Sequence, residues 1–263
     1  MKAAQARVLL TGATGGIGQA MAQALVSGGA SVMLAGRRDD TLKALARRID
    51  PGAAHTVCQQ ADLLQPQGVA SLAAAAAHWG CNVVVHAAGI PAFGPLQAIP
   101  ARDMGAVLQT NLLAPMLLTQ ALLAHLCAQP QAQVICVGSA LGRIGLPGYS
   151  VYSASKFGLR GFAEALRREL ADTAVRVQYL GPRSTRTAFN SAGVDAYNQA
   201  TGTAVDAPER VAGHLMALLA SGAAERFIGF PETLAVRING AVPSWLDGSF
   251  KTHRRTLAVL PST

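Results

Sequence analysis

Tyr152 and Lys156, a tyrosine and a lysine four positions apart, are the side chains of this sequence best suited to chemistry. In a helix, this spacing places both on one face. A phenol ordinarily loses its proton at about pH 10, and a neighbouring ammonium group that stabilises the phenolate lowers that pKa. The pair therefore predicts an acid and base that works at neutral pH.

A glycine-rich segment near the N-terminus supplies a second chemical signal. Gly12, Gly16 and Gly18 lie where a short apolar run gives way to a helical pattern. Glycines there permit a tight turn and let backbone N–H groups approach a pyrophosphate at a helix N-terminus. The spacing is G-x-x-x-G-x-G and not G-x-G-x-x-G, so a turn without a ligand is the alternative. We expect a dinucleotide site, which together with Tyr152 and Lys156 predicts hydride transfer to or from a carbonyl.

The end of the second apolar run indicates which dinucleotide binds. A site for NAD usually places Asp or Glu there, to accept a hydrogen bond from the ribose 2′-hydroxyl. Gly36 stands at that position, and Arg37 and Arg38 follow it. Guanidinium groups can bind a 2′-phosphate, although the two arginines could instead be the solvated start of a helix. Asp39 and Asp40 come too late to be the acceptor and favour a helix N-cap, so we expect NADP(H).

The elements that must position these residues follow an alternating pattern. Short β-rich runs without in/out alternation suit parallel strands covered on both faces, and the helices between them imply right-handed crossovers. We expect an α/β fold, a three-layer doubly wound parallel sheet (Rossmann fold), in a single domain over residues 1–263. The expected strands are 7–11, 31–36, 55–61, 82–87, 133–139 and 175–180, and the expected helices include 17–27, 41–49, 67–79 and 102–128.

Helical periodicity is clear in the segment that begins at Tyr152. Its apolar residues recur at spacings of three, four and four, at Leu159, Phe162, Leu166 and Leu170. We expect this face to pack on the sheet while the first turn carries Tyr152 and Lys156. In the preceding long helix, Pro115 is expected to kink the helix or relax one turn.

Composition limits the classes of partner. The 22 basic and 14 acidic residues give a net charge of +8, but no Lys/Arg run exceeds two residues. Nucleic-acid sites need clustered cations and interleaved aromatic residues, so we expect no nucleic-acid role. Four scattered cysteines without a CxxC pattern favour reduced thiols and no metal site. The start has no signal-peptide core and no apolar run reaches the roughly 18 residues of a membrane span, so we expect a cytoplasmic protein.

Several further motifs occur in a fixed order. They are Thr11-Gly12-x-x-x-Gly16-Ile17-Gly18, Asp62-Leu63, His86-Ala87-Ala88-Gly89, Asn111, Ser139 and Tyr152-x-x-x-Lys156. Tyr-x-x-x-Lys alone recurs by chance in many proteins, but the ordered set does not. On these motifs the chain resembles the short-chain dehydrogenases/reductases over roughly residues 5–190.

The resemblance implies catalytic roles for four residues. Tyr152 would be the general acid in reduction, and Lys156 would lower its pKa and bind the ribose hydroxyls of the nicotinamide. Ser139 would hydrogen-bond the substrate oxygen and stabilise the developing oxyanion. Asn111 would hold a water that links Lys156 to solvent. The alternatives are a helix cap at Ser139 and a turn residue at Asn111 whose side chain bonds to the backbone.

The resemblance also implies how NADP(H) is held. Asp62 would bind the adenine, Ala88 and Gly89 would line the adenosine ribose, and Pro182 and Thr187 would lie near the nicotinamide carboxamide. The full expected cofactor set is Gly12, Thr14, Gly15, Gly16, Ile17, Gly18, Arg37, Arg38, Asp62, Leu63, Ala88, Gly89, Tyr152, Lys156, Pro182, Thr185 and Thr187.

The chain departs from the family pattern within these motifs. His86 and Ala87 stand where the family often has two asparagines, and we favour a hydrogen-bonded core role for His86 over that of a catalytic base. Arg183 replaces a glycine, and Arg186 adds another charge. The two arginines either are exposed or engage the cofactor phosphate or an acidic substrate.

The last third of the chain is expected to shape the substrate site. Residues 188–222 form a lid and helix, because a long polar, turn-rich segment in a compact domain is usually functional. Residues 223–263 form a divergent extension in place of the strand that pairs subunits in many tetrameric members, so we expect a homo-oligomer, a dimer rather than a tetramer. Trp245, Leu246 and Phe250 beside Lys251, Arg254 and Arg255 could contact a membrane or a partner. We favour packing of this tail over the substrate pocket.

We therefore expect an NADP(H)-dependent oxidoreductase that transfers a hydride between nicotinamide and a ketone or secondary alcohol. Its expected partner is a small-molecule carbonyl or alcohol substrate of apolar or acyl type. A β-ketoacyl thioester reductase and a steroid or long-chain ketone reductase are alternatives within enzymes. A non-catalytic NADP(H)-binding regulator is the alternative from another class, because a fold does not fix a function.

Overall fold

A parallel sheet forms the centre of the computed structural model, which describes residues 1–230 and 232–259. Within these residues the sheet has seven strands in the order β3-β2-β1-β4-β5-β6-β7. The strands are β1 (Arg7–Thr11), β2 (Ser31–Gly36), β3 (Thr56–Gln60), β4 (Val83–His86), β5 (Ala132–Val137), β6 (Val175–Gly181) and β7 (Glu225–Phe227). The expected doubly wound parallel sheet is confirmed.

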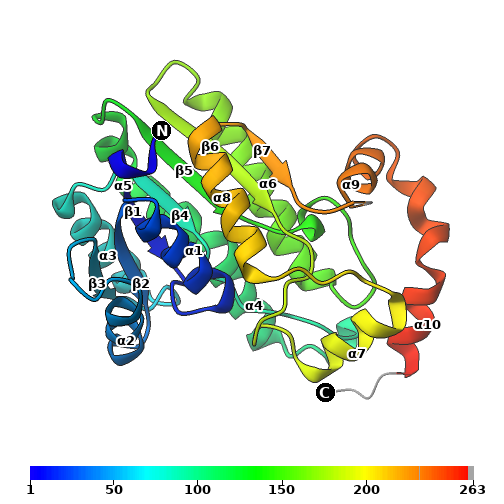
Figure 1. Ribbon diagram of the computed structural model, residues 1–263. Coiled ribbons are helices and arrows are strands. Elements are labelled where there is room, and N and C mark those ends of the chain that lie inside the picture. The colour runs from blue at the N-terminus through cyan, green and yellow to red at the C-terminus, as the bar shows by residue number, and fades with distance from the viewer. Residues whose placement is uncertain (231, 260–263) are drawn as a thin grey trace.

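Helices cover both faces of the sheet (Figure 1). They are α1 (Gly16–Ser27), α2 (Asp39–Ile49), α3 (Pro66–Trp79), α4 (Ala101–Leu108), α5 (Ala114–Cys127), α6 (Ser150–Glu169), α7 (Ala192–Thr201), α8 (Pro208–Ser221), α9 (Glu232–Ala241) and α10 (Lys251–Val259). Short 3₁₀ turns lie at Ala3–Gln5, Leu96–Ala98, Ala140–Gly142 and Pro243–Phe250. Helices α1, α2 and α8 share one apolar core with the sheet, and α3, α5 and α6 share the other. Both faces of each central strand are therefore apolar, which explains the uninterrupted hydrophobic runs.

The chain changes direction across the sheet between β1 and β4. From β1 it moves outward to β2 and β3, and β4 then pairs with the other side of β1. Thr11, the last residue of β1, pairs with Ala35 of β2 and with His86 of β4. The carboxyl ends of these strands therefore open into one crevice at the point where the strand order reverses, which is where ligands bind in such sheets.

The expected helix at 102–128 is two α-helices joined by a π-helical turn, Gln109–Leu113. Pro115 is the second residue of α5, directly after Ala114. Proline has no N–H, so the Asn111 carbonyl four residues earlier has no i+4 donor, and the chain widens by one residue there. The relaxed turn expected from Pro115 is confirmed.

One helical stretch in the described part of the chain, Ala101–Cys127, is long and apolar enough to cross a membrane on length and composition alone, with a mean hydropathy of 1.4. It reaches this value as an average and not as an uninterrupted apolar run. Leu118, Leu122 and Leu126 are fully buried against the sheet. Packing as a core helix of the domain accounts for its composition.

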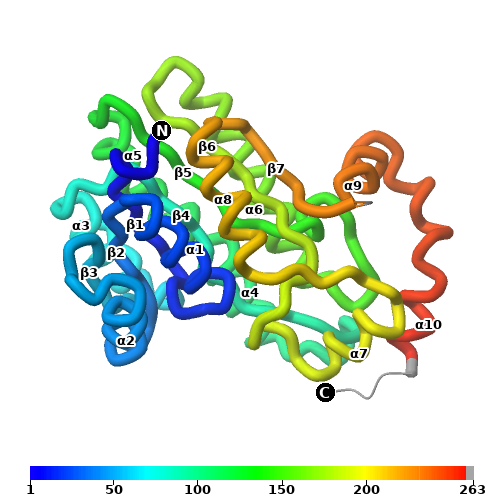
Figure 2. The backbone as a smooth tube through the Cα atoms, viewed as in Figure 1, coloured from blue at the N-terminus to red at the C-terminus, as the bar shows by residue number. Residues whose placement is uncertain are grey.

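Two elements differ from the sequence expectation. Asp39 and Asp40 lie in the first turn of α2 and are not its N-cap, which is Arg38. The segment expected to be turn-rich contains α7, capped by Ser191, whose hydroxyl accepts from the Val194 N–H at 3.3 Å. Figure 2 shows that the chain then returns through α9 and α10, so that α10 (red) lies against α7 (yellow) at the end of the molecule remote from α2 and α3.

Candidate active site

A cavity of about 1130 Å³ follows the carboxyl edge of the sheet. Every residue expected to hold the cofactor lines it, from the glycine turn after β1 to Thr187 after β6. Ser139, Tyr152 and Lys156 line its middle, whereas Asn111 is fully buried behind the wall. The structure therefore brings the expected cofactor and catalytic residues to one cavity, and their individual roles stay predictions.

The glycine turn after β1 leaves no room for side chains. Gly12 has a φ of +67°, and a Cβ there would overlap the backbone of Ala88. A Cβ on Gly18 would overlap the Gly12 carbonyl, and one on Gly16 would overlap Thr187. No side chain caps α1, whose N-cap residue is Gly15. Its first N–H groups therefore face the cavity as a site that suits a phosphate group.

The adenosine end of the cavity carries two arginines at the end of β2. Within the described residues neither Arg37 nor Arg38 makes an ion pair, because the Asp39 carboxylate pairs with Lys43 at 2.6 Å. The side chain of Gln60 on β3 donates to the Arg37 carbonyl at 2.9 Å. The guanidinium groups are therefore free to meet an anionic ligand.

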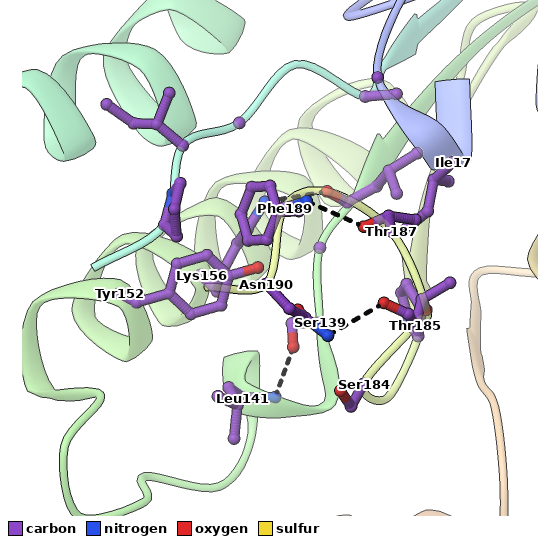
Figure 3. Close-up of a pocket in the computed structure, with 18 of the residues that line it drawn as sticks. Ile17, Ser139, Leu141, Tyr152, Lys156, Ser184, Thr185, Thr187, Phe189 and Asn190 are labelled. Atoms are coloured by element: carbon purple, nitrogen blue, oxygen red, sulfur yellow. Dashed lines mark hydrogen bonds between the residues drawn. The ribbon is translucent and has the colours of Figure 1, made fainter. Parts of the chain in front are cut away.

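Tyr152 and Ser139 meet at the middle of the cavity (Figure 3). Tyr152 lies in the first turn of α6, and Ser139 follows β5, where its hydroxyl oxygen accepts from the Leu141 N–H at 3.0 Å. Burial raises the pKa of the Tyr152 phenol above its ordinary value, and the neighbouring Ser139 hydroxyl opposes that rise only in part. The phenol is therefore protonated at neutral pH in the protein alone, contrary to the expectation of a lowered pKa.

Lys156 lies one helical turn after Tyr152 and is buried. Its Nζ lies 5.7 Å from the centre of the Tyr152 ring and donates to the Val137 carbonyl at 3.1 Å. Burial lowers the pKa of Lys156 to about 8. The side chain therefore still carries its proton at neutral pH, next to the phenol.

Asn111 lies within the π-helical turn, and its side chain is committed to protein partners. Its Oδ1 accepts from the Ile90 N–H at 2.8 Å, and its Nδ2 donates to the Ile90 carbonyl at 3.0 Å and to the Ser155 hydroxyl at 3.2 Å. The bonds to Ile90 tie α4 and α5 to the loop after β4. The structure thus shows the alternative, a side chain bonded to backbone, while the role of Asn111 in holding a water stays a prediction.

Tyr179 of β6 holds Ser139 in place, which the sequence did not reveal. Its hydroxyl donates to the Ser139 carbonyl at 2.9 Å and accepts from the Ser139 N–H at 3.0 Å. The ring is fully buried between Gly138 and Gly142, where a Cβ on either glycine would overlap it. The only sequence signal is indirect, since the two glycines flank a serine at the end of a strand.

His86 is a core residue, as the sequence favoured. It is buried, and its Nε2 lies 2.8 Å from the Thr119 hydroxyl. Burial lowers the pKa of His86 to about 4, so the ring is neutral at pH 7.

Arg183 is not exposed, which corrects that expectation, and a contact with a cofactor phosphate or an acidic substrate stays a prediction. Its guanidinium makes a bidentate pair with Asp206 at 2.9 and 3.0 Å and contacts Glu232 at 3.1 Å. Arg210 also reaches Asp206, at 3.0 Å. The network ties both ends of the segment around α7 to α9. Arg186, by contrast, is exposed.

The substrate end of the cavity is lined by the lid and the tail. Phe189 lies over the edge of the Tyr152 ring, with 6.1 Å between ring centres (Figure 3). Leu246, Phe250 and His253 of the tail line the same cavity, whereas Trp245 is 77% exposed. The tail packs over the pocket, as we favoured from the sequence.

Several residues that line the cavity were not expected from the sequence, among them Tyr149, Tyr197 and His253. Tyr149 lies one turn before Tyr152, so helical spacing alone could have indicated it. Nothing local marks Tyr197 or His253, which reach the cavity only through the packing of α7 against α10.

Comparisons with known proteins agree with this arrangement. The profile of the short chain dehydrogenase family matches residues 6–198. A human 3-oxoacyl-[acyl-carrier-protein] reductase is 35% identical over 178 residues, which cover 67% of this chain and 74% of that protein. The chain spans only 56% of the length of several other curated relatives that it matches.

Solved structures with a similar fold hold different nucleotides. A short chain dehydrogenase from Burkholderia cenocepacia, in complex with NADP, is 26% identical with a TM-score of 0.78, over 87% of this chain and 98% of that one. A short chain dehydrogenase/reductase from Burkholderia phymatum, in complex with NAD, is 20% identical with a TM-score of 0.81, over 90% of this chain and 94% of that one. The second likeness shows the fold alone.

Proposed function

The chain belongs to the short-chain dehydrogenase family, and from that premise we propose that it is an NADP(H)-dependent reductase of apolar ketones. Members of this family are oxidoreductases that bind a nicotinamide cofactor and act on small molecules with CH–OH groups. One observation carries the proposal: a single cavity joins the uncapped start of α1 to Tyr152, Ser139 and Lys156. A dinucleotide bound at the first end would present its nicotinamide to the second.

The residues of the cavity fit NADP(H). The N–H groups at the start of α1 would bind the pyrophosphate, and the unpaired guanidinium groups of Arg37 and Arg38 would bind the 2′-phosphate. Asp62 lines the adenosine end, although its Oδ1 already accepts from the Leu64 N–H at 3.1 Å. Thr187, against Gly16, would lie beside the nicotinamide.

The chain's own groups supply the proton and stabilise the charge. When bound, NADPH supplies the hydride that reduces the carbonyl carbon. Tyr152 donates its phenolic proton to the carbonyl oxygen, and its raised pKa keeps that proton available at neutral pH. The Ser139 oxygen accepts from Leu141, so its proton is free for the same carbonyl oxygen. Lys156, protonated below about pH 8, stabilises the phenolate that remains.

Reprotonation of Tyr152 needs a route from solvent to Lys156. We propose that the water predicted at Asn111 binds to the backbone carbonyl of Asn111. The side-chain amide is occupied, because its Nδ2 donates to the Ile90 carbonyl and to the Ser155 hydroxyl. Pro115 cannot donate to that carbonyl, which keeps the position open for a water.

A test of the reaction compares the wild type with Tyr152→Phe. We expect the wild type to consume NADPH with apolar cyclic ketones and the variant to lose at least about 100-fold in kcat, because the proton donor is gone. NADPH binding, followed by nicotinamide fluorescence, should persist in both. Tight NADPH binding without turnover over a broad ketone panel would instead support the regulator.

A test of cofactor choice uses Arg37→Asp. The new carboxylate repels a 2′-phosphate and accepts from a 2′-hydroxyl, so the ratio of kcat/KM for NADPH to that for NADH should fall by roughly 100-fold or more. Arg47→Asp, on the exposed side of α2, is the matched control for charge. An unchanged ratio in Arg37→Asp would refute the assignment of the 2′-phosphate to β2.

A β-ketoacyl thioester is the second candidate substrate, supported by the human 3-oxoacyl-[acyl-carrier-protein] reductase to which the chain is similar. The tail that covers the cavity counts against a carrier-bound substrate. Turnover of acetoacetyl-coenzyme A faster than of cyclic ketones would favour the thioester.

Assembly and location stay predictions. Enzymes of this family often form oligomers, and we propose a dimer in the cytoplasm. The mass in solution, measured by light scattering, tests the dimer, and cell fractionation tests the location.

A further inference from the structure

A row of rings leads from the reacting hydroxyl to the far end of the cavity. Tyr152 and Tyr149 belong to α6, Tyr197 to α7 and His253 to α10. Successive ring centres along this row lie 6.3 Å, 5.9 Å and 5.5 Å apart. The tail thus adds the last ring of a wall that begins at Tyr152.

The remaining walls of this end are mostly apolar. The aliphatic side chains that line it include Leu141, Ile144, Leu146, Val194 and Leu246. Aromatic and aliphatic walls bind the flat faces of ring systems well. An elongated substrate built from rings therefore fits this end better than a polar chain does.

His253 is one of several polar side chains that the lid and the tail add to the cavity lining, and Tyr197 fixes its orientation. The Tyr197 hydroxyl lies 3.0 Å from the Pro147 carbonyl and 2.8 Å from the His253 Nδ1. A carbonyl can only accept, so the single proton of Tyr197 goes to Pro147. The Nδ1 must then carry a proton and donate to the Tyr197 oxygen. In a neutral imidazole this leaves Nε2 as an acceptor.

The acceptor is held in place and has no hydrogen-bond partner among the residues that the structure describes. Tyr197 is buried and packs against Phe93, with 5.1 Å between ring centres. Burial lowers the pKa of His253, which keeps its ring neutral at pH 7. Within the described residues Nε2 makes no hydrogen bond, and the ring lines the cavity.

We propose that His253 Nε2 accepts a hydrogen bond from a hydroxyl group at the end of the substrate remote from its carbonyl. The preferred substrates are then elongated aromatic or polycyclic ketones with a distal hydroxyl. This inference rests on the proposed function, which places the carbonyl at Tyr152.

Three matched ketones test it: 4-phenylcyclohexanone and its para-hydroxy and para-methoxy derivatives. Their dissociation constants are measured by calorimetry in the presence of NADP⁺, with which they do not react, and kcat/KM is measured with NADPH. His253→Asn keeps an amide atom near the Nδ1 position but none at Nε2, whereas His253→Gln returns one to Nε2. Thr252→Asn, on the exposed face of α10, is the control for disturbance of the helix.

We expect the wild type to bind the para-hydroxy ketone roughly three- to tenfold more tightly than the para-methoxy ketone, the effect of one neutral hydrogen bond. The preference should vanish in His253→Asn, return in part in His253→Gln and stay unchanged in Thr252→Asn. A preference that survives in His253→Asn, none in the wild type, or no binding of any of the three would overturn the inference.

The two proposals fail separately. A His253-dependent preference in binding without NADPH oxidation would refute the proposed function and leave the role of His253 standing. Turnover of all three ketones with equal kcat/KM and equal dissociation constants would do the reverse.

Discussion

At the scale of residues, the reacting groups depend on neighbours that lie behind the cavity wall. The phenol of Tyr179 bonds to both backbone groups of Ser139: it accepts from the N–H and donates to the carbonyl. Burial raises the pKa of Tyr179, so its hydroxyl stays a neutral group that can donate and accept at once. Asn111 in turn is held by Ile90 and Ser155. Ser139 and Asn111 are therefore positioned by buried hydrogen bonds and not by packing alone.

We expect Tyr179→Phe to lower kcat by roughly tenfold or more, because small displacements of a catalytic group cost that much. The variant leaves the buried Ser139 N–H without a partner, while the Ser139 carbonyl keeps the Gly142 N–H at 3.0 Å, so the free energy of unfolding should also fall by about 1–3 kcal/mol. NADPH affinity should not change, because the phenol does not reach the nucleotide end. Steady-state kinetics, nucleotide titration and urea unfolding measure the three quantities.

An unchanged kcat in a destabilised Tyr179→Phe variant would show that the residue is structural only. Tyr197→Phe is a useful comparison, because it removes another buried phenol that contacts the cavity at the substrate end. Its effect should fall on the KM of the ketone.

The sequence could predict those residues whose roles depend only on residues nearby in the chain. Gly12, Gly16 and Gly18 work because a strand turns into a helix there, and that junction is visible in the sequence. Tyr179 and His253 have roles that arise only when distant segments meet, so no local pattern marks them. The sequence therefore predicted residues that line the cofactor edge of the cavity, whose roles stay predictions, and the substrate end only as a segment.

At the scale of elements, the substrate lid is tied by an ion-pair network where the family usually has a glycine. Arg183, with 12% of its side chain exposed, joins the end of β6 to Asp206 and to Glu232 of α9. Asp206 is almost fully buried, so it needs its partners to remain charged. The network fixes both ends of α7 and the start of the tail together.

We expect Arg183→Gly, the family residue at this position, to lower the free energy of unfolding by about 3 kcal/mol, because Asp206 loses its bidentate partner. The KM of the ketone should rise more than the KM of NADPH, since the lid and not the nucleotide end loses its tie. Thermal unfolding and kinetics check both effects.

Arg186→Gly is the matched control, three residues away in the same loop and exposed. Its effect on unfolding should stay within about 0.5 kcal/mol. Equal losses of stability in the two variants would contradict the assignment of the lid tie to Arg183.

The bounds of the elements show where sequence patterns lose resolution. The strands at 7–11 and 31–36 have the predicted bounds. The other predicted strands differ from the observed ones by one or two residues at one or both ends. β7 has only three residues and half-buried side chains, too little for a periodic signal. α7 was missed although Ser191 and Gly202 are ordinary capping residues, because its polar composition hid its short apolar face.

At the scale of the whole molecule, the sheet buries several polar side chains, among them His86, Gln133 and Gln178. His86 of β4 is the titratable case, buried against Thr119 of α5. Its folded pKa of about 4 lies below the ordinary 6.5. The unfolded chain takes up the proton first, so acid favours unfolding, and stability contributed by the neutral ring is present above pH 6.5 and lost as the pH falls towards 4.

We therefore expect the free energy of unfolding to fall with acidification by roughly 3 kcal/mol more in the wild type than in His86→Asn between pH 6.5 and pH 4. Denaturant unfolding at several pH values measures this difference, in which the other titrating groups cancel. Parallel curves for the two proteins would refute the assignment of this pH dependence to His86.

The tail, which includes α9 and α10, contributes to the substrate end of the cavity, whereas the expected nucleotide residues come from earlier in the chain. The expected nucleotide residues all lie before residue 190, while the tail adds Leu246, Phe250 and His253 to the cavity lining. Changes in the tail can thus alter which ketone is accepted without disturbing the nucleotide site. For protein engineering, we therefore expect that the last helix can be exchanged to change the substrate that the enzyme accepts, while the nucleotide site stays the same.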